Sequence, residues 1–136
     1  MSTCSIADSL QAAMDTFRFE YSNKTAALVA KINKERLEIE LGSVDDYDSF
    51  EDMVEALALP ETTPRYLLIS YEHVSDRVQY PLCMIYYNPP SKAELNMLYA
   101  SNSVMMSSKA GIGSRIVELR NGDDLTKEWL SGQLRK

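Results

Sequence analysis

Histidine, cysteine and glycine are scarce in this chain. Its 136 residues include one histidine, two cysteines and five glycines. A zinc site needs Cys and His residues paired at short spacing, whereas Cys4, His73 and Cys83 lie far apart, so we expect no metal site. The segment GIG at 111–113 lacks the further glycine and the lysine of a phosphate-binding loop. We therefore expect no cofactor, and the sequence argues against a nucleotide-dependent enzyme.

Side chains that could carry catalysis are equally few. His73 stands in a polar stretch that is predicted to be a solvated loop, with no partner evident from the sequence. Cys83 lies in an apolar stretch and is predicted to be a buried core thiol. Three acids, Asp45, Asp46 and Asp48, superficially resemble a calcium loop, but Phe50 stands where that loop requires glycine. The sequence predicts a protein that is not an enzyme and has no catalytic residue; a small hydrolase that uses His73 is the alternative.

Long apolar stretches and basic clusters are missing too. No segment approaches the roughly 18 consecutive apolar residues of a membrane span, and residues 1–20 lack the features of a signal peptide. Two isolated cysteines are typical of reduced thiols in a reducing compartment, so we expect a cytoplasmic protein without a membrane span. Nucleic-acid binding requires a stripe of Lys and Arg that the sequence does not contain.

Charge is distributed unevenly along the chain. The formal net charge is −6, yet residues 35–61 hold ten acids and a single base, Arg36. From residue 62 onward nine bases face seven acids, which makes the later half mildly positive. We expect the acidic stretch to be a solvated face, and the later half to tolerate an acidic partner surface.

The length of 136 residues predicts a single domain, residues 1–136. The order of the predicted helices and strands indicates an α/β fold with a mixed β-sheet covered by helices on both faces. Ser5 with Asp8 is expected to cap a first helix, and Asn33 with Lys34 to form a tight hairpin turn. Tyr66–Tyr71 is expected to be a central strand. The other predicted elements are strands at Ala26–Ile32, Leu37–Leu41, Val78–Tyr87 and Ile116–Leu119, and helices at Ser49–Ala58 and Asp124–Leu134, the last anchored by Leu125 and Trp129.

The segment after Pro89 and Pro90 is predicted to be a helix with two apolar sides. Ser91 and Glu94 have the spacing of a capping box, which satisfies backbone N–H groups at a helix start. One side of the helix is expected to face the core and the other to dock into a cleft of another protein; a helix buried on both sides is the alternative. The first side comprises Leu95, Leu98, Tyr99, Asn102 and Met106, and the second Ala93, Met97, Ala100 and Val104.

Four sequence blocks resemble the ADF homology (ADF-H) domain and, within it, the glia maturation factor family. They are PRYLLISY at 64–71, RVQYPLCMI at 77–85, MLYAS at 97–101 and LRNGDDLTKEWL at 119–130. The resemblance covers nearly the whole chain and implies the cofilin-like ADF-H fold. It also implies a monomeric regulator of the actin cytoskeleton, at actin patches or the cell cortex, that binds the actin-related protein 2/3 complex. Such proteins inhibit branch nucleation and promote debranching of filaments.

The resemblance also separates two functions. Cofilin-like proteins, which bind and sever filaments, carry basic residues just before the methionine of the MLYAS-like motif. Here the matching positions are Glu94 and Asn96, so a cofilin-like severing protein is the alternative rather than the first interpretation. Many family members carry lysines after the motif, whereas in this chain residues 102–108, between the motif and Lys109, carry no positive charge. Apolar contact through Val104 and Met105 is expected to replace that attraction.

Two partner-binding surfaces follow from the resemblance. The first meets an actin-related subunit, with Met97 as the expected anchor because a thioether adapts to an irregular cleft. The second meets the first actin subunit of a daughter filament, unless its charges are merely solvated. Phosphorylation at Ser2, Thr3 or Ser5 would repel an acidic cleft. The first surface comprises Ser2, Thr3, Glu94, Asn96, Met97, Ser101 and Val104, and the second Asp76, Arg77, Lys127, Glu128, Arg135 and Lys136.

Overall fold

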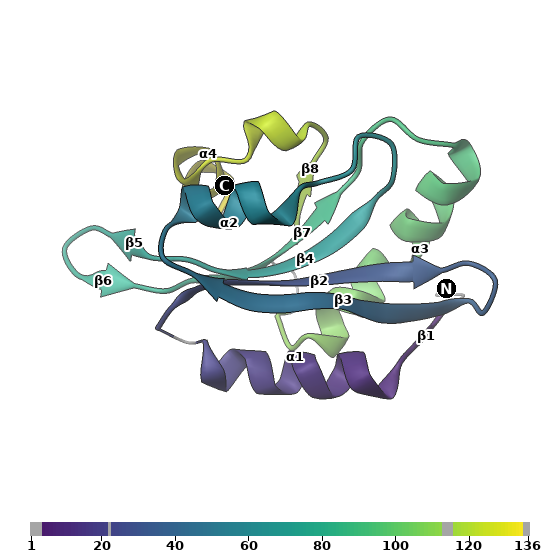
Figure 1. The fold of residues 1–136 in the computed structure, drawn as a ribbon, viewed down its shortest axis with the longest axis horizontal. Helices are drawn as coiled ribbons and strands as arrows, with labels where there is room; N and C mark the ends of the chain where they lie inside the picture. The colour runs from purple at the N-terminus through teal and green to yellow at the C-terminus, as the bar shows by residue number, and fades with distance from the viewer. Residues whose placement is uncertain (1–3, 22, 113–115, 135–136) are drawn as a thin grey trace.

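A six-stranded mixed sheet with helices on both faces forms the body of the protein (Figure 1). The computed structural model describes residues 4–21, 23–112 and 116–134. The sheet has the order β1-β3-β2-β4-β7-β8, and β5 pairs with β6 in a separate hairpin. The elements are β1 (Ser5–Ile6), α1 (Asp8–Glu20), β2 (Thr25–Asn33), β3 (Glu38–Tyr47), α2 (Phe50–Leu57), β4 (Arg65–Ser70), β5 (His73–Val74), β6 (Val78–Gln79), β7 (Leu82–Tyr87), α3 (Ala93–Lys109), β8 (Ile116–Leu119), a 3-10 turn (Gly122–Asp124) and α4 (Lys127–Leu134).

The predicted mixed sheet and the central place of the strand after Pro64 are confirmed. Strand β4 lies between β2 and β7, antiparallel to both. Residues 66–70 of β4 are all buried, as expected for an apolar strand that is covered on both faces. The outer pairs β1–β3 and β7–β8 are parallel, which makes the sheet mixed.

Two hydrophobic clusters lie on opposite faces of the sheet. Helices α1 and α3 cover one face, where Leu10, Met14 and Tyr99 are buried in the first cluster. Helices α2 and α4 cover the other, where Met53 and Leu130 are buried in the second cluster. Full burial of one large apolar side chain stabilises a fold by about 1.5–3 kcal/mol, so both clusters contribute substantially.

Both of the capped helix starts that the sequence predicts, at Ser5 and at Ser91, differ in the structure. Helix α1 begins after Ala7 and α3 after Lys92, and neither residue makes a side-chain cap. Ser5 instead belongs to β1, where its N–H donates to Leu37 O at 3.0 Å. A side-chain cap that was not predicted is present at α2, where the Ser49 hydroxyl accepts from Asp52 N at 3.1 Å. Both wrong predictions used an S-x-x-acid spacing that tertiary contacts override.

Strand boundaries also shift. The turn between β2 and β3 covers residues 34–37 rather than Asn33 and Lys34, and Asn33 Oδ1 accepts from Glu35 N and Arg36 N. Strand β3 continues to Tyr47, so the acids at 45 and 46 are part of the sheet. The expected strand Val78–Tyr87 is divided into β6 and β7, and α4 begins at Lys127 instead of Asp124.

Candidate partner-binding surfaces

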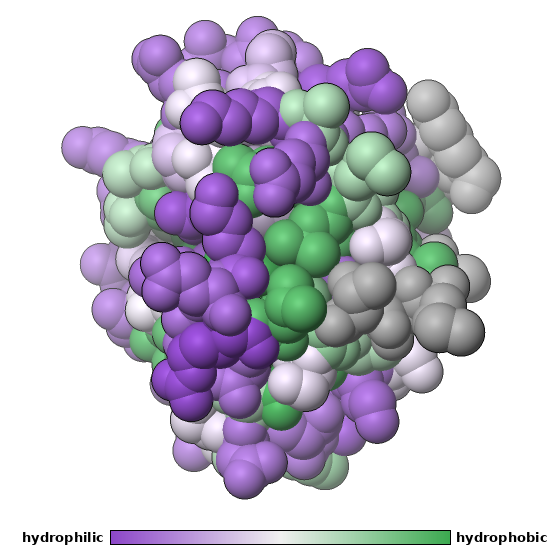
Figure 2. Space-filling model, turned by 90° about the vertical axis from the view of Figure 1, so that its right-hand side faces the viewer, coloured by the Kyte–Doolittle hydropathy of each residue, from purple (hydrophilic) through white to green (hydrophobic). Residues whose placement is uncertain are grey.

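One side of α3 faces solvent along its whole length. Met97 is 72% exposed and Val104 73% exposed, and Glu94 and Ser101 on the same side are also exposed. We call these four residues the outer line of α3. Figure 2 shows the end of the molecule where α3 begins, with hydrophobic side chains gathered near the middle and hydrophilic ones to their left and below. The alternative of a helix buried on both sides is therefore wrong.

The inner side of α3 explains why the outer line stays exposed. Tyr99 is buried, its hydroxyl accepts from Ile32 N at 2.9 Å, and its carbonyl accepts from the Tyr66 hydroxyl. Asn102 is also buried and donates through Nδ2 to Leu98 O at 2.8 Å. These contacts tie α3 to β2 and β4, so the helix cannot rotate to hide its outer side.

The beginning of the described chain is held against the middle of α3. Cys4 is 7% exposed, and its N–H donates to Asn102 Oδ1 at 3.1 Å. Ser2 and Thr3 of the first predicted surface lie outside the described residues, but Cys4 directly follows them in sequence.

Two residues assigned to the outer side lie differently. Asn96 is half-buried and turns back toward Ser91, whose hydroxyl donates to Asn96 Oδ1 at 2.6 Å. This bond replaces the predicted capping box. Met105 is half-buried against the first cluster, so of the two apolar residues expected to contact a partner only Val104 projects outward.

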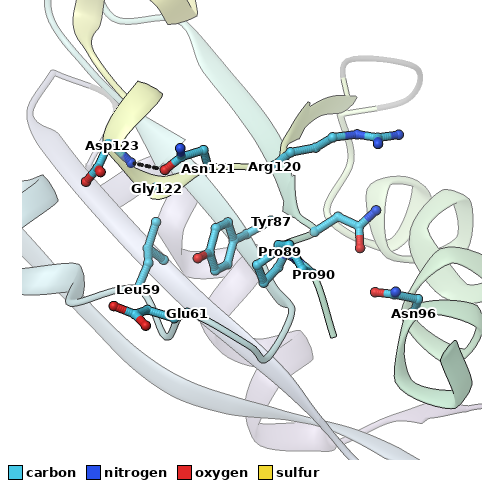
Figure 3. A pocket seen from close by; sticks show the side chains of 11 residues that line it. Leu59, Glu61, Tyr87, Pro89, Pro90, Asn96, Arg120, Asn121, Gly122 and Asp123 are labelled. Atoms are coloured by element: carbon cyan, nitrogen blue, oxygen red, sulfur yellow. Dashed lines mark hydrogen bonds between the residues drawn. The ribbon is translucent and has the colours of Figure 1, made fainter. Parts of the chain in front are cut away.

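Asn96 borders a hollow of about 610 Å³ between the start of α3 and the loop after β8 (Figure 3). Tyr87 lies at its side and donates from its hydroxyl to Pro60 O at 2.6 Å. Burial raises the pKa of Tyr87, and the nearby Glu61 and Asp123 raise it further. The side chains that line the hollow include asparagine amides, acids and one arginine. They do not include a nucleophile next to a base, so the lining gives no sign of a catalytic site.

The second predicted surface is divided between a projecting hairpin and α4. Asp76 and Arg77 are exposed at the tip between β5 and β6, while Lys127 is half-buried and Glu128 exposed at the start of α4. A hollow of about 390 Å³ separates the base of the hairpin from α4, with Val74 on its hairpin side. Arg135 and Lys136 lie outside the described residues.

Two exposed valines of this hairpin were not predicted to belong to the second surface. Val74 and Val78 are cross-strand partners and are 62% and 55% exposed. They flank Ser75, Asp76 and Arg77, and an apolar residue on each side of a short polar turn is a hairpin signal that could have identified them. The second surface therefore combines charge with an exposed apolar pair.

His73 is not the solvated loop residue that the sequence predicted. It is half-buried in β5, and its Nδ1 lies 3.5 Å from the hydroxyl oxygen of Ser131, which is 3.1 Å from the Tyr71 hydroxyl. A Ser–His distance of 3.5 Å exceeds the reach of an activated pair. The arrangement instead joins the hairpin to α4. Cys83 is fully buried, as predicted.

Within the described residues, no group of three or more His, Cys, Asp or Glu side chains is placed to hold a metal ion. None of the helices searched in the same residues is long and apolar enough to cross a membrane.

Comparison with known proteins decides the family. The model for cofilin/tropomyosin-type actin-binding proteins matches residues 3–135. The chain belongs to this family. Family membership makes it an actin-regulating protein and places it among actin-binding regulators rather than with a family of enzymes.

Relatives within the actin-binding family are glia maturation factors. The chain is 33% identical over 135 residues to glia maturation factor of Drosophila melanogaster, covering 97% of this chain and 96% of the relative. It is 35% identical over 138 residues to glia maturation factor beta of Homo sapiens, covering 96% and 92%. These relatives confirm the resemblance drawn from the four sequence blocks.

Solved structures confirm the ADF-H fold of the actin-binding family. Glia maturation factor from Caenorhabditis elegans is 33% identical, has a TM-score of 0.79 and matches over 98% of this chain and 96% of its own. Cofilin from Streptomyces griseoflavus has a TM-score of 0.82 at 16% identity, over 97% of each chain, a likeness of fold alone.

Proposed function

We propose that this chain binds the actin-related protein 2/3 complex, inhibits the nucleation of actin branches and promotes the detachment of existing ones. The outer line of α3 carries the proposal, because it offers Met97 and Val104 on a rigid helix. Ser2 and Thr3 would extend this surface beyond Cys4. The glia maturation factor names of its relatives support this choice over other actin regulators.

Charge on the outer line supports an actin-related subunit over ordinary actin. Glu94 is exposed where cofilin-like proteins carry a base, and Asn96 is engaged with Ser91. An unpaired or like charge in a desolvated cleft costs on the order of kilocalories per mole. A cofilin-like severing protein is the second candidate, favoured by the shared fold. Cosedimentation with bare filaments separates the two, since only the severing protein binds them strongly.

The second surface would contact the first actin subunit of a daughter filament. The hairpin tip supplies Asp76, Arg77 and the valine pair, and α4 supplies Lys127 and Glu128; Arg135 and Lys136 would continue it. With both surfaces engaged, the chain acts as a wedge, because its binding energy favours the distorted junction and shifts the population toward dissociation.

Met97→Asp tests the first surface. Debranching, followed by microscopy of single filaments, should be abolished, because a carboxylate cannot enter an apolar cleft without a large desolvation cost. The melting curve should stay unchanged, since the side chain is exposed. Phe19→Asp is the matched control, because Phe19 is 78% exposed on another helix. Normal debranching by Met97→Asp would remove α3 from the site.

Arg77→Glu tests the second surface. Reversal of the tip charge should reduce debranching more than it reduces binding to the isolated complex, since the isolated complex lacks the daughter filament. Equal losses would contradict a separate second surface.

The remaining features of the proposal concern organisation and regulation. We propose a single domain over residues 1–136 that acts as a monomer in the cytoplasm, at actin patches or the cell cortex, without nucleic-acid or membrane partners. Ser5 is exposed in β1, and phosphate there or at Ser2 and Thr3 would add negative charge on either side of Cys4, which contacts α3 at Asn102. Mass spectrometry of the protein from cells, with binding assays of the phosphorylated form, tests this regulation.

A further inference from the structure

Strand β3 leaves one edge of the sheet open over half of its length. On its outer side, β3 pairs with β1 only at Glu38 and Ile39, and within the described residues no other strand lies beyond it. In Figure 1, β3 runs along the front of the sheet with α1 beneath it, and β1 reaches only one end. Unpaired N–H and C=O groups of such an edge can pair with an added strand.

Contacts of β2 show which backbone groups of β3 point outward. Ile32 N donates to the Tyr99 hydroxyl, so its N–H points away from β3. Backbone N–H and C=O groups of successive residues in a strand point to opposite sides, so the N–H groups of Ala30 and Leu28 also point away from β3. The backbone groups of the β3 residues opposite them then point away from β2. Ala7 N donates to Ile39 O at 3.0 Å, which agrees with this assignment. The outward residues are the Cα partners of Ile32, Ala30, Leu28 and Ala26, namely Ile39, Leu41, Val44 and Asp46.

The usable part of this edge lies between Leu41 and Asp45. Toward the end of β3, Asp46 N donates to Asp45 Oδ1 at 2.9 Å, which satisfies an outward N–H and limits further pairing. Toward the beginning, β1 occupies Ile39. We call residues 41–45 the open edge.

An apolar groove runs directly beneath the open edge. It has a volume of about 230 Å³ and lies between Val44 and the flank of α1 that carries Ala12, Ala13 and Thr16. The backbone N–H and C=O groups of Val44 point outward from the sheet edge, and the residue is 37% exposed. A side chain of an added strand that points toward α1 would enter this groove, so the edge offers main-chain bonds and the groove offers selectivity.

Acidic side chains around the groove decide which peptide fits. Glu20 borders the groove on α1, and Asp45 and Asp46 follow Val44 on β3. Tyr21 also lines the groove. Burial raises the pKa of Tyr21, and the negative charges of Glu20, Asp46 and Asp45 raise it further. Lys24 lies 3.8 Å from Asp46 and offsets only part of this charge. An occupant with basic side chains is favoured.

We propose that the open edge of β3 binds an extended basic peptide of a partner protein, which adds as a strand and places an apolar side chain in the groove beside α1. A second copy of this chain is disfavoured, because antiparallel pairing over residues 41–45 would place Asp46 of each copy opposite Glu40 of the other. This site is separate from the outer line of α3 and does not depend on the proposed function.

The probe is a blocked hexapeptide with one valine among five lysines, which carries lysines on both faces of an added strand, and it is added to the intact protein in an NMR titration. The largest amide shifts should fall in residues 41–46 and along α1 at 12–20, and the Leu41 and Val44 amides should exchange more slowly. The same peptide with glutamate in place of lysine should bind at least about tenfold more weakly, because opposite charges become like charges. Equal binding of the two peptides, or shifts elsewhere, would overturn the proposal.

Two variants separate the backbone and charge contributions. Val44→Pro removes an outward N–H on an edge strand, where proline is tolerated, and should weaken binding about tenfold with the fold retained. Glu20→Lys should weaken binding without touching the sheet, and it keeps the proposal testable if Val44→Pro fails to fold. Glu35→Lys, in the β2–β3 turn, is the matched control and should bind normally. Binding that survives Glu20→Lys would contradict the proposed occupant.

Discussion

The two sides of α3 have similar apolar content and opposite environments. Tyr99 and Met106 on the inner side are buried, while Met97 and Val104 on the outer side are mostly exposed. The inner side carries hydrogen bonds to β2, β4 and the segment at Cys4, and the outer side has only solvent or a partner to meet. Composition alone therefore does not distinguish a core side from a docking side; the polar anchors Tyr99 and Asn102 do.

Truncating one methionine on each side should give the largest contrast. Met106→Ala should lower the free energy of unfolding by about 2–5 kcal/mol, because the side chain is fully buried and leaves a cavity. Met97→Ala should change it by less than about 0.5 kcal/mol. Urea denaturation of both variants measures the difference, and similar losses would break the comparison.

Removing the inner polar anchor should have the next effect. Asn102→Leu deprives Cys4 N–H of its acceptor in a buried site, which should cost about 1–3 kcal/mol. The amide of Cys4 should then exchange faster in hydrogen-exchange measurements. Ser101→Ala, one residue away on the outer line, is the control and should leave stability and exchange unchanged. Unchanged exchange at Cys4 in Asn102→Leu would show that another contact holds the beginning of the chain.

Alkaline pH should destabilise the inner side of α3 through Tyr66, whose hydroxyl donates to the Tyr99 carbonyl. Burial raises the pKa of Tyr66 well above its ordinary value of 10.0, with smaller increases from Tyr86 and Tyr99. The folded state therefore keeps this proton above pH 10 while the unfolded state loses it, so stability falls as pH rises. The loss should reach about 1.4 kcal/mol per pH unit above 10. Tyr66→Phe should flatten that slope in urea titrations between pH 9 and about 11; an unchanged slope would contradict the assignment.

Reversing one charge on the outer line should give the smallest effect. Glu94→Lys restores a base where cofilin-like proteins have one, and should strengthen binding to bare actin filaments by less than about 1 kcal/mol. Glu35→Lys, with the same charge change in the β2–β3 turn, should not alter cosedimentation. Equal gains in both variants would show that net charge, rather than position, matters.

The sequence predicted the layers of the fold more accurately than the ends of its elements. Periodicity located Tyr66–Tyr71 in the sheet centre and separated the two sides of α3, because burial follows hydrophobic spacing directly. The predictions of helix caps at Ser5 and Ser91 were wrong, because Ser5 pairs with β3 as part of β1 and the Ser91 hydroxyl is hydrogen-bonded to Asn96. A local motif cannot show a competing long-range partner.

The candidate sites were predictable to different degrees. The outer line of α3 follows from helical spacing. Asn96 was also predicted to contact the partner, but its side chain turns toward Ser91 and is hydrogen-bonded there. The base of the β5–β6 hairpin lies beside α4 because of tertiary packing, which the spacing of residues in the sequence does not predict. The open edge of β3 depends on the strand order β1-β3-β2, and neither Val44 nor Asp45 signals it in sequence.

Methionine methyl NMR can show whether the outer line of α3 contacts the partner complex. The chain contains seven methionines, with Met97 on the outer line and Met14, Met53, Met84 and Met106 buried. When the actin-related protein 2/3 complex is added to the methyl-labelled protein, the Met97 methyl signal should shift further than those of the four buried methionines. Val104→Asp should abolish that shift. Binding of the complex with an unperturbed Met97 signal would contradict the assignment of the outer line of α3 as the contact surface.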